Sequence, residues 1–250
     1  GGISDFFLGG EARVLSKGEE GEDKKKALVK GGIEVHYDFD NQIFDATMNG
    51  ELNLKALNLT IPTHFYVEKD YGWYIHMGRP RPHPNEERIH LDLSKFDIYS
   101  YFQAGTVEID PMPPIPQEVL DILTESGVDP NFFNTRDNMV ISSDKGMIHG
   151  ADMQFDYSGS FLMFKANLDA IAGYDLAIKK FTTDCDGNPT SDNLVGVNGW
   201  YAQGQIYAGM DAQVSIHVDL SFIEKDIQIM DANAGAALMG GVPDPTWVKG

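Results

Sequence analysis

Cysteine is nearly missing from this sequence: Cys185 is the only one among 250 residues. A single cysteine excludes an intramolecular disulfide framework and a thiolate zinc cluster. No apolar stretch approaches the roughly 20 residues that a membrane-crossing helix needs, and no signal-peptide pattern stands at the start. The length is ample for a packed core. We therefore expect a globular domain without membrane insertion.

Positive charge is also scarce, since 19 Lys and Arg residues face 38 Asp and Glu residues and the net charge is −19. Such a field repels phosphate backbones and anionic membrane surfaces, and it attracts divalent cations. The composition therefore predicts no nucleic-acid partner.

Catalytic motifs are missing as well. The sequence has no Gly-x-Ser-x-Gly elbow and no glycine-rich loop that opens a helix. None of its seven histidines forms a helical i, i+4 pair backed by a carboxylate. We therefore predict that the chain is not an enzyme.

What the sequence does have is alternation. From Trp200 to Phe222 every second residue is apolar or small, a period that predicts β-structure with one buried and one solvent-facing side. We favour one long strand over two strands joined by a three-residue turn at 208–210. The residues expected on the buried side are Trp200, Ile206, Met210, Val214, Ile216, Val218 and Leu220.

Similar alternation recurs along most of the chain, and one helix interrupts it. Pro116 suits a first helical turn, an apolar stripe follows, and Gly127 ends the pattern, so we expect a short accessory helix near 116–126. The predicted fold class is all-β, with antiparallel meander sheets that form a sandwich or an extended sheet. We expect an N-terminal strand and a charged loop over 1–30, the loop covering 16–30. Residues 31–250 are expected to form a single large β-rich domain that continues beyond residue 250.

Two groups of side chains are candidate metal sites. Oxygen ligands at alternating positions of an acidic loop suit calcium, although Pro189 and the lack of a closing glutamate exclude an EF-hand. These candidate ligands are Asp184, Asp186, Asn188 and Asp192. The alternative is a polar turn without metal. Asp38, Asp40, Asn41 and Asp45 form a weaker cation group. His64 and His76 could face each other across a hairpin, as a transition-metal pair or as ordinary solvent-facing histidines.

A row of aromatic and amide side chains is the candidate ligand surface. It lies on the expected solvent-facing side of the 200–222 strand, with a spacing of about 6–7 Å, and could contact sugar rings or another protein. The row contains Tyr201, Gln203, Gln205 and Tyr207. The alternative is that a second layer, such as the 116–126 helix, covers this side.

Four segments resemble a known group of proteins. They are Gly72-Trp73-Tyr74-Ile75-His76-Met77-Gly78, Ala104-Gly105 before the proline-rich stretch 111–116, the stretch 196–205 around Trp200, and Pro243-Asp244-Pro245-Thr246-Trp247-Val248-Lys249-Gly250. The chain resembles segments of large exported surface proteins of Bacteroidota, of the TANFOR-domain type, whose function is unknown. The resemblance implies a segment of a long secreted or cell-surface polypeptide, and it transfers no catalytic residue.

We therefore predict a non-enzymatic structural or adhesive domain of a large secreted or cell-surface bacterial protein. Its expected partners are other protein domains or surface glycans, and its expected cofactor is none or Ca²⁺. The alternative function is a carbohydrate-binding module, with or without calcium dependence.

Overall fold

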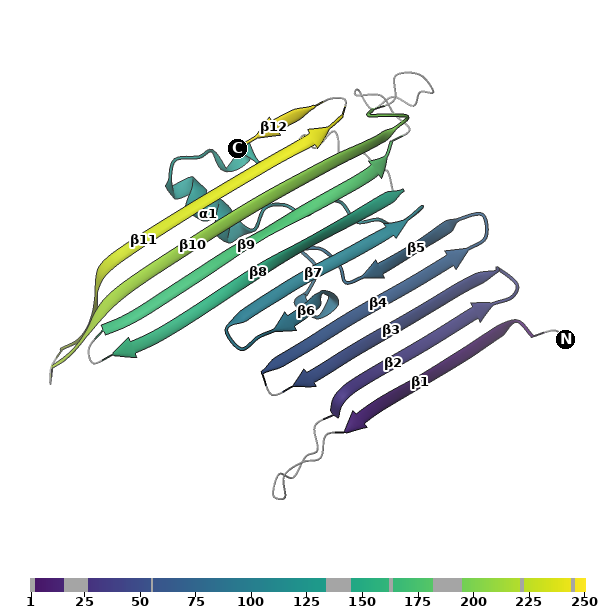
Figure 1. Cartoon of the computed structure of the whole chain (residues 1–250), viewed down its shortest axis with the longest axis horizontal. Coiled ribbons are helices and arrows are strands. Elements are labelled where there is room, and N and C mark those ends of the chain that lie inside the picture. The colour runs from purple at the N-terminus through teal and green to yellow at the C-terminus, as the bar shows by residue number, and fades with distance from the viewer. Residues whose placement is uncertain are drawn as a thin grey trace.

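The structure is a computed structural model that describes residues 3–15, 27–54, 56–133, 145–161, 164–181, 195–220, 223–243 and 246–250. Twelve strands form a single antiparallel sheet in the order β1-β2-β3-β4-β5-β7-β8-β9-β10-β11-β12, and β6 pairs with β4 and β7. Figure 1 shows the strands side by side in one open sheet, with the two termini near opposite edges. This confirms the predicted all-β class.

The elements follow one another as simple hairpins in most of the sheet. The strands are β1 (Asp5–Leu15), β2 (Ala27–Asp38), β3 (Ile43–Leu54), β4 (Leu57–Glu68), β5 (Gly72–Met77), β6 (Ile89–Asp92), β7 (Phe96–Gly105), β8 (Gly146–Phe161), β9 (Phe164–Lys180), β10 (Trp200–Leu220), β11 (Ile223–Val242) and β12 (Trp247–Lys249). The helices are η1 (Asn85–Glu87), α1 (Gln117–Glu125) and η2 (Pro130–Phe132). Of the charged loop predicted over 16–30, residues 16–26 lie outside the described residues, and 27–30 form the start of β2 and pair with β1 instead.

Over 200–220 the alternation forms one strand, as predicted, and 221–222 lie outside the described residues. β10 pairs with β9 on one side and with β11 on the other, with one irregularity in the β11 register between Val214 and Ser215. Because the chain does not turn at 208–210, the two faces of β10 keep their identities along the described strand.

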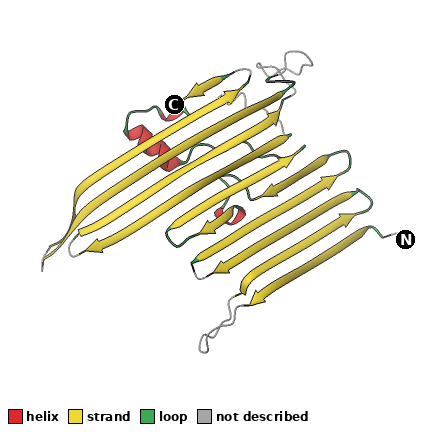
Figure 2. Ribbon diagram, in the orientation of Figure 1, coloured by secondary structure: helices red, strands yellow, loops and turns green. Residues whose placement is uncertain are grey.

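The predicted helix is confirmed to within one residue at each end. Pro116 precedes the first turn of α1, Glu118 lies in that turn, and Ser126 follows the last. Val119, Ile122 and Leu123 form the buried side of the helix. That side packs on the sheet with Tyr207 and Met239, and α1 contacts both β10 and β11. In Figure 2 the helix lies across these strands.

Two connecting segments cover one face of the sheet. Residues 78–88 follow β5, and residues 106–133 follow β7 and include α1. Arg81 from the first segment reaches Asp175 on β9 and Tyr207 on β10. Ile109 and Ile115 from the second are buried against the sheet. We call this side of the sheet the covered face and the opposite side the apolar face.

The assignment of the buried side of β10 was wrong. Trp200, Ile206 and Met210 are 40%, 55% and 42% exposed, whereas Tyr201 and Tyr207 are buried. Val214 and Ile216 are half-buried, and the side chains of Val218 and Leu220 lie outside the described set. The alternation identified two distinct faces correctly. The chain, however, places its own covering segments on the polar and aromatic face, where hydrogen-bonding side chains hold them.

Register shows how far the apolar face extends. One row crosses ten strands from β1 to β11, and each member pairs with the next: Leu8, Val35, Ala46, Phe65, Ile75, Ala104, Met147, Ile178, Ala202 and Val242. The adjacent row on the other face includes Glu34, His64, His76 and Gln103. By the same registers, the described strands place no Asp or Glu on the apolar face.

Candidate functional site

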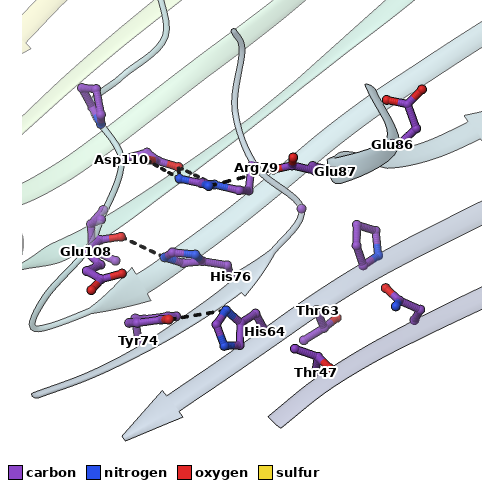
Figure 3. Close-up of a pocket in the computed structure, with 15 residues that line it drawn as sticks. Thr47, Thr63, His64, Tyr74, His76, Arg79, Glu86, Glu87, Glu108 and Asp110 are labelled. Atoms are coloured by element: carbon purple, nitrogen blue, oxygen red, sulfur yellow. Dashed lines mark hydrogen bonds and ion pairs between the residues drawn. The ribbon is translucent and has the colours of Figure 1, made fainter. Parts of the chain in front are cut away.

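A polar groove opens where the covering segments meet the N-terminal half of the sheet. Its volume is about 840 Å³, and it is lined from β3, β4 and β5, from η1 and from the segment after β7. Figure 3 shows its labelled side chains, among them His64, Tyr74, His76, Arg79 and Asp110. Gly78 turns the chain away from β5 at a φ of +68°, and a Cβ there would lie 2.7 Å from the backbone nitrogen of Ile89.

The two histidines face each other, as the hairpin predicts. His64 on β4 pairs directly with His76 on β5. His64 Nε2 lies 2.9 Å from Asp45 Oδ1, and its Nδ1 lies 3.4 Å from the Tyr74 hydroxyl. A neutral His64 thus donates to the carboxylate of Asp45 and accepts from the phenol. Burial raises the pKa of Tyr74 to about 12, so its hydroxyl stays protonated and acts as a donor.

His76 has a different environment. Its Nε2 donates to the backbone oxygen of Glu108 at 2.9 Å, and its ring stacks on that of Tyr74 with centroids 4.4 Å apart. Burial lowers the pKa of His76, which keeps the imidazole neutral at physiological pH. The floor of the groove is therefore a stack of neutral rings that continues through Tyr74 to Tyr66.

An ion pair forms one side of the groove. Arg79 Nη2 lies 3.0 Å from Asp110 Oδ1, and Arg79 Nε lies 3.2 Å from Asp110 Oδ2. Gln103 is fully buried; its Nε2 donates to Asp110 and its Oε1 accepts from the Asp110 backbone N–H. Burial by itself would raise the pKa of Asp110, but hydrogen bonds from Arg79 and Gln103 outweigh it and hold that pKa below its usual range.

This ion pair makes a pH-dependent contribution to stability. A carboxyl whose pKa is lowered by folding stabilises the fold above its unfolded pKa and loses that contribution as the pH falls through the folded value. We expect Asp110→Asn to lower the free energy of unfolding by about 1–2 kcal/mol at pH 7, because it removes the charged partner of Arg79. The loss is modest because Arg79 is partly exposed. The difference should shrink once the pH drops below about 3.9. Urea unfolding of both proteins at pH 7 and in acid checks this, and a difference that grows in acid would contradict it.

The most buried polar cluster lies deeper on the covered face. The carboxylate of Asp175 on β9 accepts from Tyr101 Oη at 2.8 Å and from Gln205 Nε2 at 2.7 Å. Arg81 Nη2 donates to Tyr207 Oη at 2.7 Å and lies 3.5 Å from Asp175. Burial, the largest influence, raises the pKa of Asp175. These groups hold the first covering segment on the sheet.

A second arginine anchors the same segment. Arg88 donates to Asp152 on β8, and both side chains are 2% exposed. The Arg88 guanidinium also lies over the ring of Tyr99, 4.6 Å from its centroid. This ion pair has a structural role, because neither side chain lines the groove or contacts the solvent.

The predicted ligand row lies mostly beneath a second layer, as the alternative interpretation of this side of the strand described. Tyr201, Gln205 and Tyr207 are buried, and Gln203 is half-buried. Gln205 donates to the backbone oxygen of Pro113, and Tyr207 packs against Val119 and Leu123 of α1 in one cluster. A second layer therefore buries Tyr201, Gln205 and Tyr207, and Gln203 alone of the row stays partly exposed.

The metal candidates divide into two groups. Asp184, Asp186, Asn188 and Asp192 all lie outside the described residues. The weaker group is split: Asp38 accepts from the backbone N–H groups of Asp40 and Asn41 in a turn, while Asp45 pairs with His64. Over the described ranges, no three His, Cys, Asp or Glu side chains are grouped so that they could hold a metal ion.

The residues that sequence reasoning missed are mainly cations. The sequence analysis assigned no role to Arg79 or Arg81, yet both make contacts that position the first covering segment. The sequence did contain a signal for this role, because arginines lie next to prolines there in a chain that has few positive charges. Their partners lie 31 to 126 residues away in sequence, so no local pattern identifies them.

In comparisons with known proteins, no family model, curated protein or solved structure matches the chain. In the described part of the chain, no helix has the length and apolar character needed to span a membrane.

Proposed function

We propose that this chain is a non-enzymatic structural or adhesive domain of a large secreted or cell-surface bacterial protein, and that it assembles through the apolar face of its sheet. The observation that carries the proposal is the apolar row across ten strands, which the described segments of the chain leave uncovered. Large exposed apolar patches mark interaction surfaces in soluble proteins.

Exposure along the C-terminal strands supports this role. Met153, Tyr174, Leu176, Ile206 and Leu238 are each 38–55% exposed. They come from four neighbouring strands and lie on the same face. Fully burying one such side chain is worth about 1.5–3 kcal/mol. A face of this kind gains free energy when another apolar layer covers it.

The chemistry of the groove favours a non-enzymatic role. Asp45, His64 and Tyr74 form a hydrogen-bonded chain, but the raised pKa of Tyr74 makes its phenol a poor nucleophile. The carbohydrate-binding alternative rested on Tyr201, Gln203, Gln205 and Tyr207, and burial takes both tyrosines and Gln205 out of reach of a sugar.

An apolar dye tests the proposal. We expect the monomeric domain to enhance the fluorescence of 1-anilinonaphthalene-8-sulfonate, and the double variant Ile206→Glu, Met210→Glu to reduce that signal severalfold, because both side chains lie on the apolar face. Gln213→Glu is the control, since it adds one negative charge to an exposed position of β10 on the other side. A monomer that does not bind the dye, or dye binding that survives the double substitution, would overturn the proposal.

A further inference from the structure

We infer that a second copy of this chain covers the apolar face, so that two sheets pack face to face about a twofold axis that runs parallel to the strands. This inference rests on the proposed function and names its partner. Three properties of the face carry it: its area, its lack of carboxylates, and the distribution of large and small side chains.

The area exceeds what a stable dimer needs. Strands about 4.8 Å apart that rise about 3.4 Å per residue make a sheet of this width and strand length roughly 50 Å by 40 Å, or about 2,000 Å². A stable interface buries about 800 Å² on each partner. The face could therefore support a dimer even if less than half of it were in contact.

The charge distribution allows two such faces to meet. The net charge is −19, yet the described strands place their Asp and Glu residues on the covered face or beyond the strand ends. Packed sheets lie about 10 Å apart, and the carboxylates of the two copies would point away from each other. At ordinary ionic strength the Debye length is about 10 Å, so their repulsion is largely screened.

Side-chain size fixes the orientation. Both halves of the face carry large side chains, but alanine is concentrated on the C-terminal half. The large side chains of the N-terminal half include Phe44, Met48, Leu52, Ile61, Phe65 and Trp73. The alanines of the C-terminal half lie between large residues such as Ile206 and Met210, and include Ala166, Ala170, Ala172, Ala208, Ala232 and Ala236. A twofold axis along the central strand β7 places the alanine-rich strands of each copy opposite the N-terminal strands of its partner, so that large side chains enter the spaces above the alanines.

This axis predicts which strands meet. β7 is the middle strand of the sheet path, so β3 of one copy lies opposite β10 of the other. Leu52 on β3 and Ala208 on β10 belong to one cross-strand row of the apolar face, so this axis places them opposite each other. A twofold axis perpendicular to the strands would instead place β3 on β3 and β10 on β10.

The first experiment is light scattering after size exclusion on the intact chain. We expect a mass of twice 27.7 kDa. Ile206→Glu should raise the dimer dissociation constant about a hundredfold or more, because the twofold axis buries the new charge twice. Far-UV circular dichroism should stay unchanged, and Gln213→Glu should leave the dimer intact. A monomer at all concentrations would overturn this inference, and the dye experiment would then decide separately whether the apolar face is an interaction surface.

The second experiment tests the orientation by cross-linking in a Cys185→Ser background. We expect a mixture of Leu52→Cys and Ala208→Cys chains to form a bismaleimide-linked dimer more efficiently than either variant alone. Efficient cross-linking within each variant alone would contradict the strand-parallel axis. No cross-linking in any combination, from a protein of dimeric mass, would place the contact elsewhere and overturn the inference.

Discussion

Replacing Arg88 with alanine should lower the free energy of unfolding by about 3–5 kcal/mol, because it leaves a buried carboxylate without its charged partner. Asp152 is 2% exposed, and besides Arg88 it accepts a hydrogen bond from Gln154 Nε2 at 2.9 Å. The substitution also removes the guanidinium that lies over Tyr99. Urea denaturation followed by tryptophan fluorescence measures the change.

A matched control separates burial from charge. Arg13 forms an ion pair with Glu11 at 2.7 Å, but both side chains are largely exposed. Arg13→Ala should therefore leave the denaturation midpoint unchanged, since exposed pairs contribute little. Equal shifts for Arg13→Ala and Arg88→Ala would show that Arg88 does not hold the first covering segment on the sheet.

The second large effect is expected at a glycine beneath that segment. A Cβ at Gly150 would lie 2.6 Å from the ring of Tyr101 and would also contact the carboxylate of Asp175. Gly150→Val should cost about 3 kcal/mol or more, because it overpacks the site and disturbs the hydrogen bond between those two residues. Thermal unfolding measures the loss.

Gly50 is the control for this substitution. It lies on the apolar face of β3, and a Cβ there would meet nothing within 4 Å. Gly50→Val should be neutral or slightly stabilising, because β-branched residues favour strands. A Gly150→Val protein as stable as Gly50→Val would mean that the space above Gly150 is open.

Strand positions and the helix could be predicted from the sequence because their signals are local. Alternation sets the strands, and Pro116 and Gly127 bracket α1. Each of these features depends on residues that are close together in the chain.

The identity of the covered face could not be predicted, because period-two alternation does not show what lies above each face. The sequence alternates between Ile206 and Tyr207 in the same way whether the face of Ile206 or the face of Tyr207 is covered. The answer depends on Arg81 and Arg88, which bind partners 64 to 126 residues away. The apolar side still requires a cover, and the proposed assembly supplies it from a second copy.

Oxidation of methionines by dilute hydrogen peroxide, followed by peptide mass spectrometry, tests the central claim most directly. In the monomeric Ile206→Glu variant, Met48, Met153 and Met210 should oxidise quickly, because each is more than 40% exposed on the apolar face. Met239, which is 3% exposed beneath the covering layer, should stay protected. Oxidation of Met239 as fast as that of Met210, or protection of Met210 in the monomer, would show that the chain covers the other face.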